Sequence, residues 1–142
     1  MQVKDVLGHK GKAVVTLGSS ADVAELLSVL AEHNIGAIVV SDDGRAVSGI
    51  VSERDVVRAL PGRGADLLSA PVTEIMTADV HTCSPEDDVS ALARTMTERR
   101  FRHMPVMHDG ALVGIVTIGD IVKQRIDELE TAQDQLVGYI NS

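Results

Sequence analysis

Aromatic side chains are nearly missing from this sequence. Its 142 residues include one Phe, one Tyr and no Trp, whereas proteins that bind RNA or single-stranded DNA commonly stack the bases on aromatic rings. Positive charge is also scarce, because 13 Lys and Arg residues stand against 21 Asp and Glu residues and the net charge is −8. A nucleic acid or an anionic membrane is therefore not expected as the main partner. A local basic pocket for a small anion stays open.

Cysteine and long apolar segments are scarce as well. Cys83 is the single cysteine, so no intramolecular disulfide can form and a reducing compartment is the simplest interpretation. The first residues lack the apolar core of a secretory signal, and no stretch has the length of a membrane span. We expect a soluble protein of the cytoplasm without a membrane partner.

Aliphatic residues supply the core instead. Hydrophobic residues make up 44% of the chain, enough for one domain or for two half-size units that share a core. The order of features repeats once, with a period of about 65 residues, which is too long for a solenoid. We expect an α+β fold of two β-α-β-β-α units, related by a pseudo-twofold axis and followed by a C-terminal helix. The expected boundaries are 1–61 and 72–126 for the units, 62–71 for the linker and 127–142 for the helix.

In the first unit, a one-sided apolar stripe predicts a helix from Val23. Ser19 and Asp22 are expected to act as its N-cap pair. A second helix from Glu53 is expected to end before Pro61, because proline interrupts helical hydrogen bonding. Strands are expected at residues 13–16, 37–40 and 47–52, the last two joined by a turn at residues 42–45.

The second unit repeats this order. Residues 84–87 read Ser-Pro-Glu-Asp, which is typical of a helix start with a capping serine and a proline at the first helical position. An apolar stripe from Val89 to Met96 predicts the helix itself. Strands are expected at residues 80–82, 103–107 and 111–117, the last two joined by a turn at residues 108–110.

A short motif ends the third strand of each unit. Residues 49–55 read Gly-Ile-Val-Ser-Glu-Arg-Asp, and residues 114–120 read Gly-Ile-Val-Thr-Ile-Gly-Asp. In both copies a hydroxyl residue precedes an acid by three positions at the start of a helix. A helix N-terminus and a hydroxyl suit a phosphate, and a carboxylate suits a ribose diol. The acids could instead cap their helices, and the two roles can coexist.

Taken together, these features resemble the cystathionine-β-synthase (CBS) domain family, as a tandem pair. The resemblance rests on Val-Thr-Glu-Ile-Met at residues 72–76, Phe-Arg-His-Met-Pro-Val at residues 101–106 and the motif at residues 114–120, and it covers about residues 3–126. It implies a regulatory module, not an enzyme, that binds AMP, ADP, ATP or NAD, or in some members S-adenosylmethionine. It also implies a homodimer that signals to a separate, unidentified protein.

The resemblance further implies a set of ligand contacts. Asp55 and Asp120 would accept hydrogen bonds from ribose hydroxyls, and Arg102 would hold phosphate as a bidentate donor. The other expected contacts are Thr16, Ser52, Arg54, Thr82, His103 and Thr117. Each cleft is expected to combine the first strand of one unit with the hydroxyl–acid motif of the other. The two clefts should differ, because the first unit has Gly-Ala at residues 36–37 where the second has the basic pair Arg102-His103.

Two other functions remain open from the sequence. A metal-binding or redox protein would use His81, Cys83 and His103, although their spacing matches no strong zinc motif and we expect no metal. A purely structural homodimerisation protein would need no ligand at all. Calorimetry with adenosine compounds and metal analysis would separate these three classes.

The C-terminal residues carry a possible dimer contact. Six positions step by 4, 3, 4, 3 and 4, as in a coiled coil. They are Val122, Ile126, Leu129, Gln133, Leu136 and Ile140. A helix with this seam could pair with a second copy of the chain, which we favour, or fold back over its own module.

Overall fold

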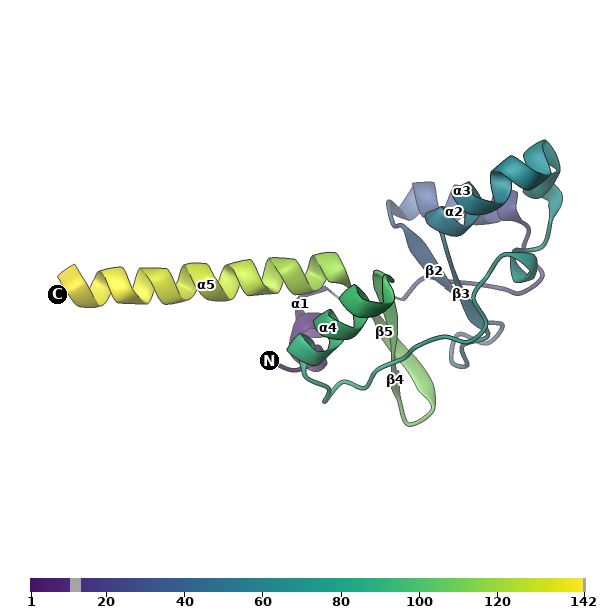
Figure 1. Cartoon of the computed structure of the whole chain (residues 1–142). Helices are drawn as coiled ribbons and strands as arrows, with labels where there is room; N and C mark the ends of the chain where they lie inside the picture. The colour runs from purple at the N-terminus through teal and green to yellow at the C-terminus, as the bar shows by residue number, and fades with distance from the viewer. Residues whose placement is uncertain (11–13, 142) are drawn as a thin grey trace.

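The first half of the molecule is a small sheet covered by two helices. In the computed structural model, which describes residues 1–10 and 14–141, strands β1 (Thr16–Leu17), β2 (Ala37–Val40) and β3 (Gly49–Ser52) form a sheet in the order β1-β2-β3. β1 runs parallel to β2, and β3 runs antiparallel to it. Helices α2 (Val23–His33) and α3 (Glu53–Arg63) lie together beside this sheet (Figure 1).

The second half repeats the helix and the hairpin. Helix α4 (Val89–Arg99) precedes an antiparallel pair of strands, β4 (His103–His108) and β5 (Ala111–Thr117), close to the predicted bounds. The strand expected at residues 80–82 does not form, and the neighbouring Cys83 makes a single bridge to β4 instead. The α+β class with two repeats is confirmed, although the first strand of the second repeat is reduced to one bridge.

The strands of the first repeat are shorter than predicted. β1 begins only at Thr16, and Ala13 of the expected strand lies outside the described residues. β3 begins at Gly49 rather than at Val47. Val47 lies between the strand and the preceding turn, in which the side chain of Asp43 accepts the N–H groups of Arg45 and Ala46 at 2.8 and 2.9 Å.

The cap of α2 differs in part from the prediction. Asp22 alone is the N-cap, and its side chain accepts the N–H of Glu25 at 2.8 Å. Ser19 turns away to Asp42, to which its N–H and hydroxyl donate at 2.8 and 2.9 Å. These hydrogen bonds, chiefly the one from the Ser19 N–H, hold the pKa of Asp42 below its usual range. The turn after β2 is thus fastened to the start of α2.

The start of α4 also lies further along the chain than predicted. The helix begins at Val89 with Asp88 in the N-cap position. Residues 84–87 form a separate turn, in which the side chain of Asp87 accepts the N–H of Ser84 at 2.8 Å and the Asp87 N–H donates to the Ser84 carbonyl at 3.1 Å. The carbonyls of Pro85 and Asp87 accept the N–H groups of Lys4 and Val3 of α1, at 2.8 and 2.9 Å. Since α4 starts only at Val89, Ser84 does not cap it.

Proline does not stop α3 where the sequence predicted. The helix runs through Pro61 to Arg63. In its last turn the proline removes one N–H donor, and the N–H of Gly64 still reaches the carbonyl of Leu60. A 3₁₀ helix, η1 (Gly64–Ser69), follows directly and buries Leu67 completely. The residues expected to be a linker are therefore largely helical and packed.

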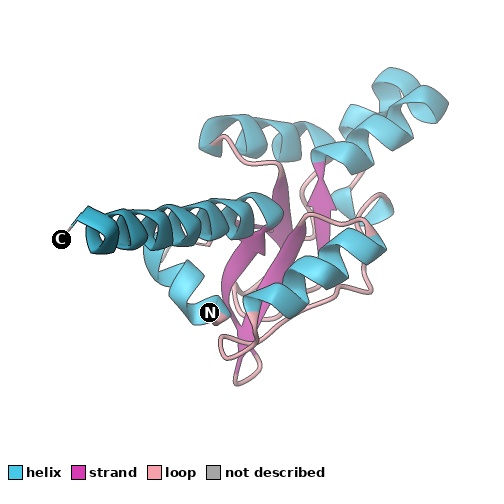
Figure 2. Ribbon diagram, turned by 60° about the vertical axis from the view of Figure 1, so that its left-hand side comes forward, coloured by secondary structure: helices cyan, strands magenta, loops and turns pink. Residues whose placement is uncertain are grey.

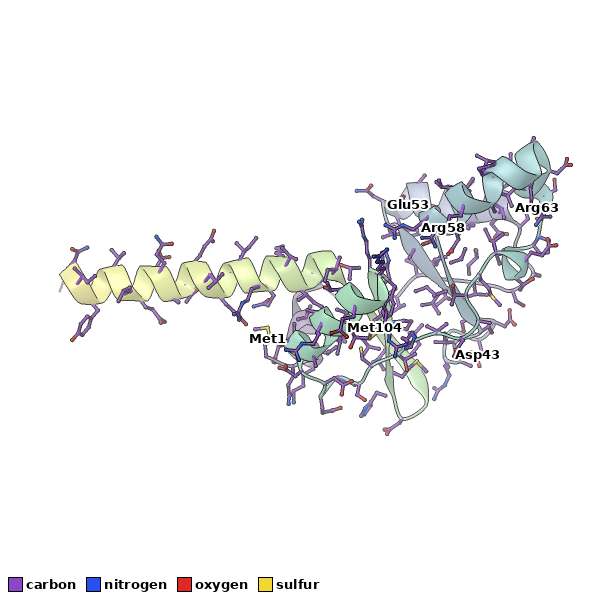
Figure 3. All side chains as sticks on the ribbon, in the orientation of Figure 1. Met1, Asp43, Glu53, Arg58, Arg63 and Met104 are labelled. Carbon is purple, nitrogen blue, oxygen red and sulfur yellow. The ribbon has the colours of Figure 1, made fainter. Side chains whose placement is uncertain are left out.

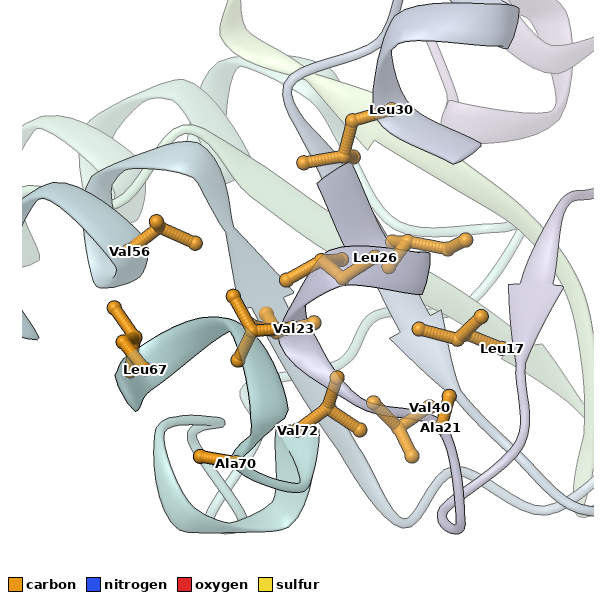
Figure 4. Packing of buried hydrophobic residues seen from close by; sticks show 12 residues of the cluster. Leu17, Ala21, Val23, Leu26, Leu30, Val40, Val56, Leu67, Ala70 and Val72 are labelled. Carbon is orange, nitrogen blue, oxygen red and sulfur yellow. The ribbon is translucent and has the colours of Figure 1, made fainter. Parts of the chain in front are cut away.

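Each half has its own aliphatic core, and the opening segments of the two repeats are exchanged between them. Leu26 of α2 lies at the centre of the first core, which also contains Val72 of the short 3₁₀ helix η2 (Val72–Glu74) (Figure 4). Val3 and Val6 of α1 (Val3–Lys10) pack instead in the second core with α4, β4 and β5. Neither repeat therefore has a complete core without a segment from the other.

The glycine that opens each hydroxyl–acid motif lies against an exchanged segment. A Cβ atom on Gly49 would be 2.6 Å from the Sδ of Met76 and 2.8 Å from the carbonyl oxygen of Thr77. A Cβ atom on Gly114 would be 2.7 Å from the Cδ2 of Leu7. A side chain at either position would overlap with these neighbouring atoms, which explains why both copies of the motif begin with glycine.

We expect the substitution Gly49→Ala to lower the free energy of unfolding by about 1–3 kcal/mol, the usual cost of overpacking a core. Gly114→Ala should cost less, because the Leu7 side chain can change rotamer whereas the Thr77 carbonyl is part of the backbone. Urea denaturation of both variants measures the difference. A Gly49→Ala variant as stable as the wild type would contradict this packing.

The C-terminal helix α5 (Ile118–Asn141) projects away from both repeats (Figures 1 and 2). Ile121 in its first turn is buried, but the expected seam after it is open, with exposed fractions from 49% at Ile126 to 70% at Ile140. The helix does not fold back over its own module. Within the described residues, no helix combines the length and apolar character needed to cross a bilayer.

Candidate functional site

Both hydroxyl–acid motifs form reciprocal caps at the start of a helix. Before α3, the N–H of Ser52 donates to Asp55 Oδ2 at 2.8 Å, and the N–H of Asp55 donates to Ser52 Oγ at 3.4 Å. Before α5, the N–H of Thr117 donates to Asp120 Oδ2 at 2.9 Å, and the N–H of Asp120 donates to Thr117 Oγ1 at 3.0 Å. The capping role that the sequence left open is therefore present, and it fixes the direction of both carboxylates.

The larger of two cavities beside these caps lies at the start of α5. This α5 cavity has a volume of about 600 Å³. Thr117 and Asp120 line one part of it, and Val14 and Val15, which lead into β1, line another. Its other charged and polar side chains are those of Arg102, His103, Glu53 and Asn34. The cavity thus joins the first-strand segment of one repeat to the hydroxyl–acid motif of the other, as expected for one cleft.

The smaller cavity lies at the start of α3. This α3 cavity has a volume of about 190 Å³ and is lined by the equivalent motif of the first repeat, including Ser52, Arg54 and Asp55. Arg102 and His103 line it as well. The sequence assigned this basic pair to one cleft, but the structure places it between both. The two cavities are therefore neighbours with a shared basic wall.

Two of the expected contacts lie elsewhere. Thr16 is half-buried at the start of β1, and Thr82 is exposed just before Cys83. Neither lines the α3 or the α5 cavity. The other seven expected residues all line one or both.

Two arginines of the α3 cavity were not predicted as contacts. Arg58 lies one helical turn after Arg54 on α3, so the i, i+4 spacing could have indicated it. Arg100 lines the cavity from the C-terminal end of α4.

The residues of the metal or redox alternative do not converge. His81 is exposed, stacks on Phe101 with ring centroids 5.2 Å apart, and has its Nε2 3.1 Å from Arg99. Cys83 is buried beside the Pro105 carbonyl, whereas His103 faces the two cavities. The described side chains include no group of three or more His, Cys, Asp or Glu residues arranged to hold a metal ion.

We expect Cys83 to react slowly with thiol reagents in the folded protein. Burial raises the pKa of its thiol to about 12, so at pH 8 the thiolate is about a thousandfold rarer than in an unfolded chain with a pKa near 9. Iodoacetamide labelling with and without denaturant, followed by mass spectrometry, measures the ratio. Fast labelling of the native protein at pH 8 would contradict this burial.

The same shift predicts a loss of stability in alkali. The thiol of the unfolded chain ionises first, so the contribution of Cys83 to the free energy of unfolding is complete below about pH 9 and decreases as the pH rises toward 12.

Comparison with known proteins decides the family. The CBS domain model matches residues 3–62 and 72–127. The chain belongs to the CBS domain family. The mitochondrial CBS domain-containing protein CBSX3 of Arabidopsis thaliana is 33% identical to it over 146 aligned positions, which span 97% of this chain and 71% of the relative.

Solved structures of CBS proteins share this fold over most of the chain. The CBS-domain containing protein ATU1752 from Agrobacterium tumefaciens has a TM-score of 0.85 and 45% identity, over 88% of this chain and 99% of its own. The CBS domain pair of protein MJ0100 has a TM-score of 0.78 and 29% identity, over 90% of this chain and 98% of its own. That structure is a complex with 5'-methylthioadenosine and S-adenosyl-L-methionine. CBS pairs of this fold therefore include one that binds adenosine compounds.

Proposed function

We propose that this chain is a non-catalytic regulatory CBS module that binds one adenosine ligand in the α5 cavity. Its volume of about 600 Å³ lies in the usual range of about 300–1,000 Å³ for small-molecule sites. The wall combines the chemistry that a nucleotide needs: a carboxylate for ribose hydroxyls at Asp120, and a hydroxyl and cations for phosphate at Thr117, Arg102 and His103. The convergence of these four side chains of the second repeat, facing Val14 and Val15 of the first repeat across the cavity, is the observation that carries the proposal.

The α3 cavity is the weaker candidate for a nucleoside. Ser52, Arg54 and Asp55 supply equivalent chemistry, but about 190 Å³ is below the usual range for such ligands. We therefore propose one well-bound nucleotide per chain. The candidates are AMP, ADP, ATP and NAD, and the complex of the MJ0100 CBS pair supports an adenosine compound in general.

Signalling would follow from the position of the α5 cavity. Thr117 caps α5 and Asp120 lies in its first turn, while Val14, Val15 and residues 34–37 belong to the first repeat. A ligand in contact with all of them favours the closed arrangement of the repeats and one orientation of α5. A separate protein, still to be identified, would read this population shift. We propose a cytoplasmic location on the basis of the single reduced cysteine.

Isothermal titration calorimetry with AMP, ATP, NAD and S-adenosylmethionine tests this function. We expect at least one adenosine compound to bind with a stoichiometry near one per chain, and to raise the melting temperature by the linkage between binding and folding. If none of the four binds at millimolar concentration, the sensing function is wrong. The structural alternative then remains, because a dimerisation protein has a melting temperature that no adenosine compound changes.

We also propose that α5 pairs with its counterpart in a homodimer. Its seam has isoleucine at positions 126 and 140 and leucine at positions 129 and 136, the a and d pattern that favours two parallel strands. In that register Arg125 lies opposite the partner's Glu130, so the flanking charges attract each other. Arg125 is 3.5 Å from Glu128 of its own helix, and the pairing would exchange this exposed contact for one across the interface.

A further inference from the structure

Four arginine side chains converge beside the α3 cavity. Arg54 and Arg58 come from α3, and Arg100 and Arg102 come from the end of α4 and the residues before β4. All four are exposed, and in the described part of the chain no carboxylate forms an ion pair with any of them. Figure 3 labels Arg58, together with Glu53, on α3. We call these four residues the arginine cluster.

The cluster has an excess of positive charge where the rest of the chain is acidic. Two carboxylates, Glu53 and Asp55, line the same cavity as the four arginines, and that of Asp55 already accepts hydrogen bonds from Ser52. A third hollow of about 460 Å³ is lined by Arg54, Arg100 and Arg102, with no carboxylate among its lining residues. On a chain of net charge −8, this is a local site of attraction for an anion.

Two members of the cluster occupy positions that local structure disfavours. Arg54 lies in the first turn of α3, next to the positive end of the helix dipole, where an acid would be preferred. Arg100 is the C-cap of α4 with φ 61° and ψ 38°, in the left-handed region. At the corresponding cap of α2 the chain has Asn34, a residue that tolerates this conformation much better. The helix dipole favours a cation at Arg100 but not at Arg54, and the left-handed conformation suits asparagine better than arginine at position 100. A requirement for positive charge at this place explains both arginines.

The cluster adjoins the proposed nucleoside site. Arg102 and His103 line the α5 cavity as well as the α3 cavity, and Arg102 also lines the third hollow together with Arg54 and Arg100. Arg102 therefore connects the α5 cavity to the rest of the cluster. The α3 cavity is small for a second nucleoside, but guanidinium groups are well suited to phosphate oxygens. A ligand with a sulfonium cation, such as S-adenosylmethionine, gains nothing from these charges.

We propose that the arginine cluster binds the polyphosphate chain of a nucleoside diphosphate or triphosphate whose nucleoside lies in the α5 cavity. This inference rests on the proposed function and specifies its ligand class. It assigns binding roles to Arg58 and Arg100, and it ranks ligands by their number of phosphate groups. The phosphate of AMP would use Thr117, Arg102 and His103, and the second and third phosphates would add contacts with Arg54, Arg58 and Arg100.

Calorimetric titration of the full chain with adenosine, AMP, ADP, ATP, S-adenosylmethionine and inorganic tripolyphosphate, in the presence of EDTA, tests the ranking. We expect ATP to bind at least about tenfold more tightly than AMP, since hydrogen bonds between charged groups are stronger than those between neutral groups. The advantage of ATP should decrease from 50 to 200 mM salt, because exposed charges are screened. S-adenosylmethionine should bind no more tightly than adenosine.

The variant Arg100→Asn separates binding from folding. Asparagine is the residue of the equivalent cap in the first repeat, so the melting temperature should be unchanged or higher. ATP affinity should decrease roughly five- to tenfold, while AMP affinity stays the same. Arg94→Asn, which removes an exposed charge from α4 away from all three hollows, is the matched control and should leave ATP affinity unchanged.

Two results have different meanings. If AMP and ATP bind equally and Arg100→Asn changes neither, the polyphosphate inference is overturned and the proposed function remains. If no adenosine compound binds, the proposed function fails and the inference fails with it, whether or not tripolyphosphate binds.

Discussion

Replacing Asp120 with alanine is expected to weaken the binding of every adenosine nucleotide by about tenfold or more. Its carboxylate lines the α5 cavity and is held in place by the N–H of Thr117, so it is oriented before the ligand arrives. A charged hydrogen bond to a ribose hydroxyl contributes roughly 1.5–3 kcal/mol, which corresponds to about tenfold in affinity or more. Calorimetry with the wild type and the variant measures the ratio.

Asp55→Ala is the matched control for this experiment. Asp55 makes the same reciprocal cap with Ser52, so both variants should lose a similar amount of stability, about 0.5–2 kcal/mol. Asp55 lines the arginine-rich α3 cavity, and its removal makes that cavity more positive. ATP affinity of Asp55→Ala should therefore be unchanged or higher. Equal losses of affinity in the two variants would mean that the effect comes from the cap and not from contact with the ligand.

Replacing Leu129 with glutamate is expected to prevent the proposed homodimer from forming. Leu129 is 58% exposed in the single chain and occupies a d position at the middle of the α5 seam. Burial of a leucine contributes about 1.5–3 kcal/mol, and a twofold interface buries it twice. The dissociation constant should rise by more than about a hundredfold, which sedimentation velocity over a concentration series measures.

Thr131→Glu is the control for Leu129→Glu. It adds the same charge to the same projecting helix, two residues further on and away from the seam, so it should leave the dimer intact. Charge reversal tests the parallel register: Arg125→Glu alone should weaken the dimer, and Arg125→Glu combined with Glu130→Arg should restore it. A wild-type chain that sediments as a monomer at micromolar concentration would overturn the pairing of α5.

The sequence predicted those elements that local patterns determine. The apolar stripes of α2 and α4 depend only on residues three and four positions apart. The hairpin of β4 and β5 depends on the turn at Asp109 and Gly110, both of which have positive φ. The predictions failed where contacts with residues distant in the sequence determine the local structure. Residues 80–82 do not form a strand because only Cys83 meets β4. Residues 84–87 form a turn whose Pro85 and Asp87 carbonyls accept the N–H groups of Lys4 and Val3.

The exchange of the opening segments could not be predicted from a repeat. Similar segments at residues 3–7 and 72–76 indicate a duplication, but each packs against the half to which it does not belong by sequence order. Local patterns cannot distinguish the two arrangements, because the apolar positions are the same in both. The close approach of Leu7 to Gly114 and of Met76 to Gly49 appears only in three dimensions.

The hydroxyl–acid motif of the candidate site could be predicted from the sequence, but the positions of its arginines could not. The spacing of Ser52 and Asp55, repeated at Thr117 and Asp120, is local and therefore visible in the sequence. Arg100 reaches the cavity only because α4 ends there in a left-handed residue. The sharing of Arg102 between both cavities depends on how the repeats face each other, and no single repeat contains that information.

Native mass spectrometry of the gently purified full chain tests the central claim most directly, because it reports bound ligand and oligomeric state together. The expected spectrum shows a dimer that carries an adenosine nucleotide on each chain, either retained from the cell or added at micromolar ATP. Loss of that added mass in Asp120→Ala, but not in Asp55→Ala, would agree with a ligand in the α5 cavity. A bare protein at millimolar AMP, ATP, NAD and S-adenosylmethionine would contradict the account.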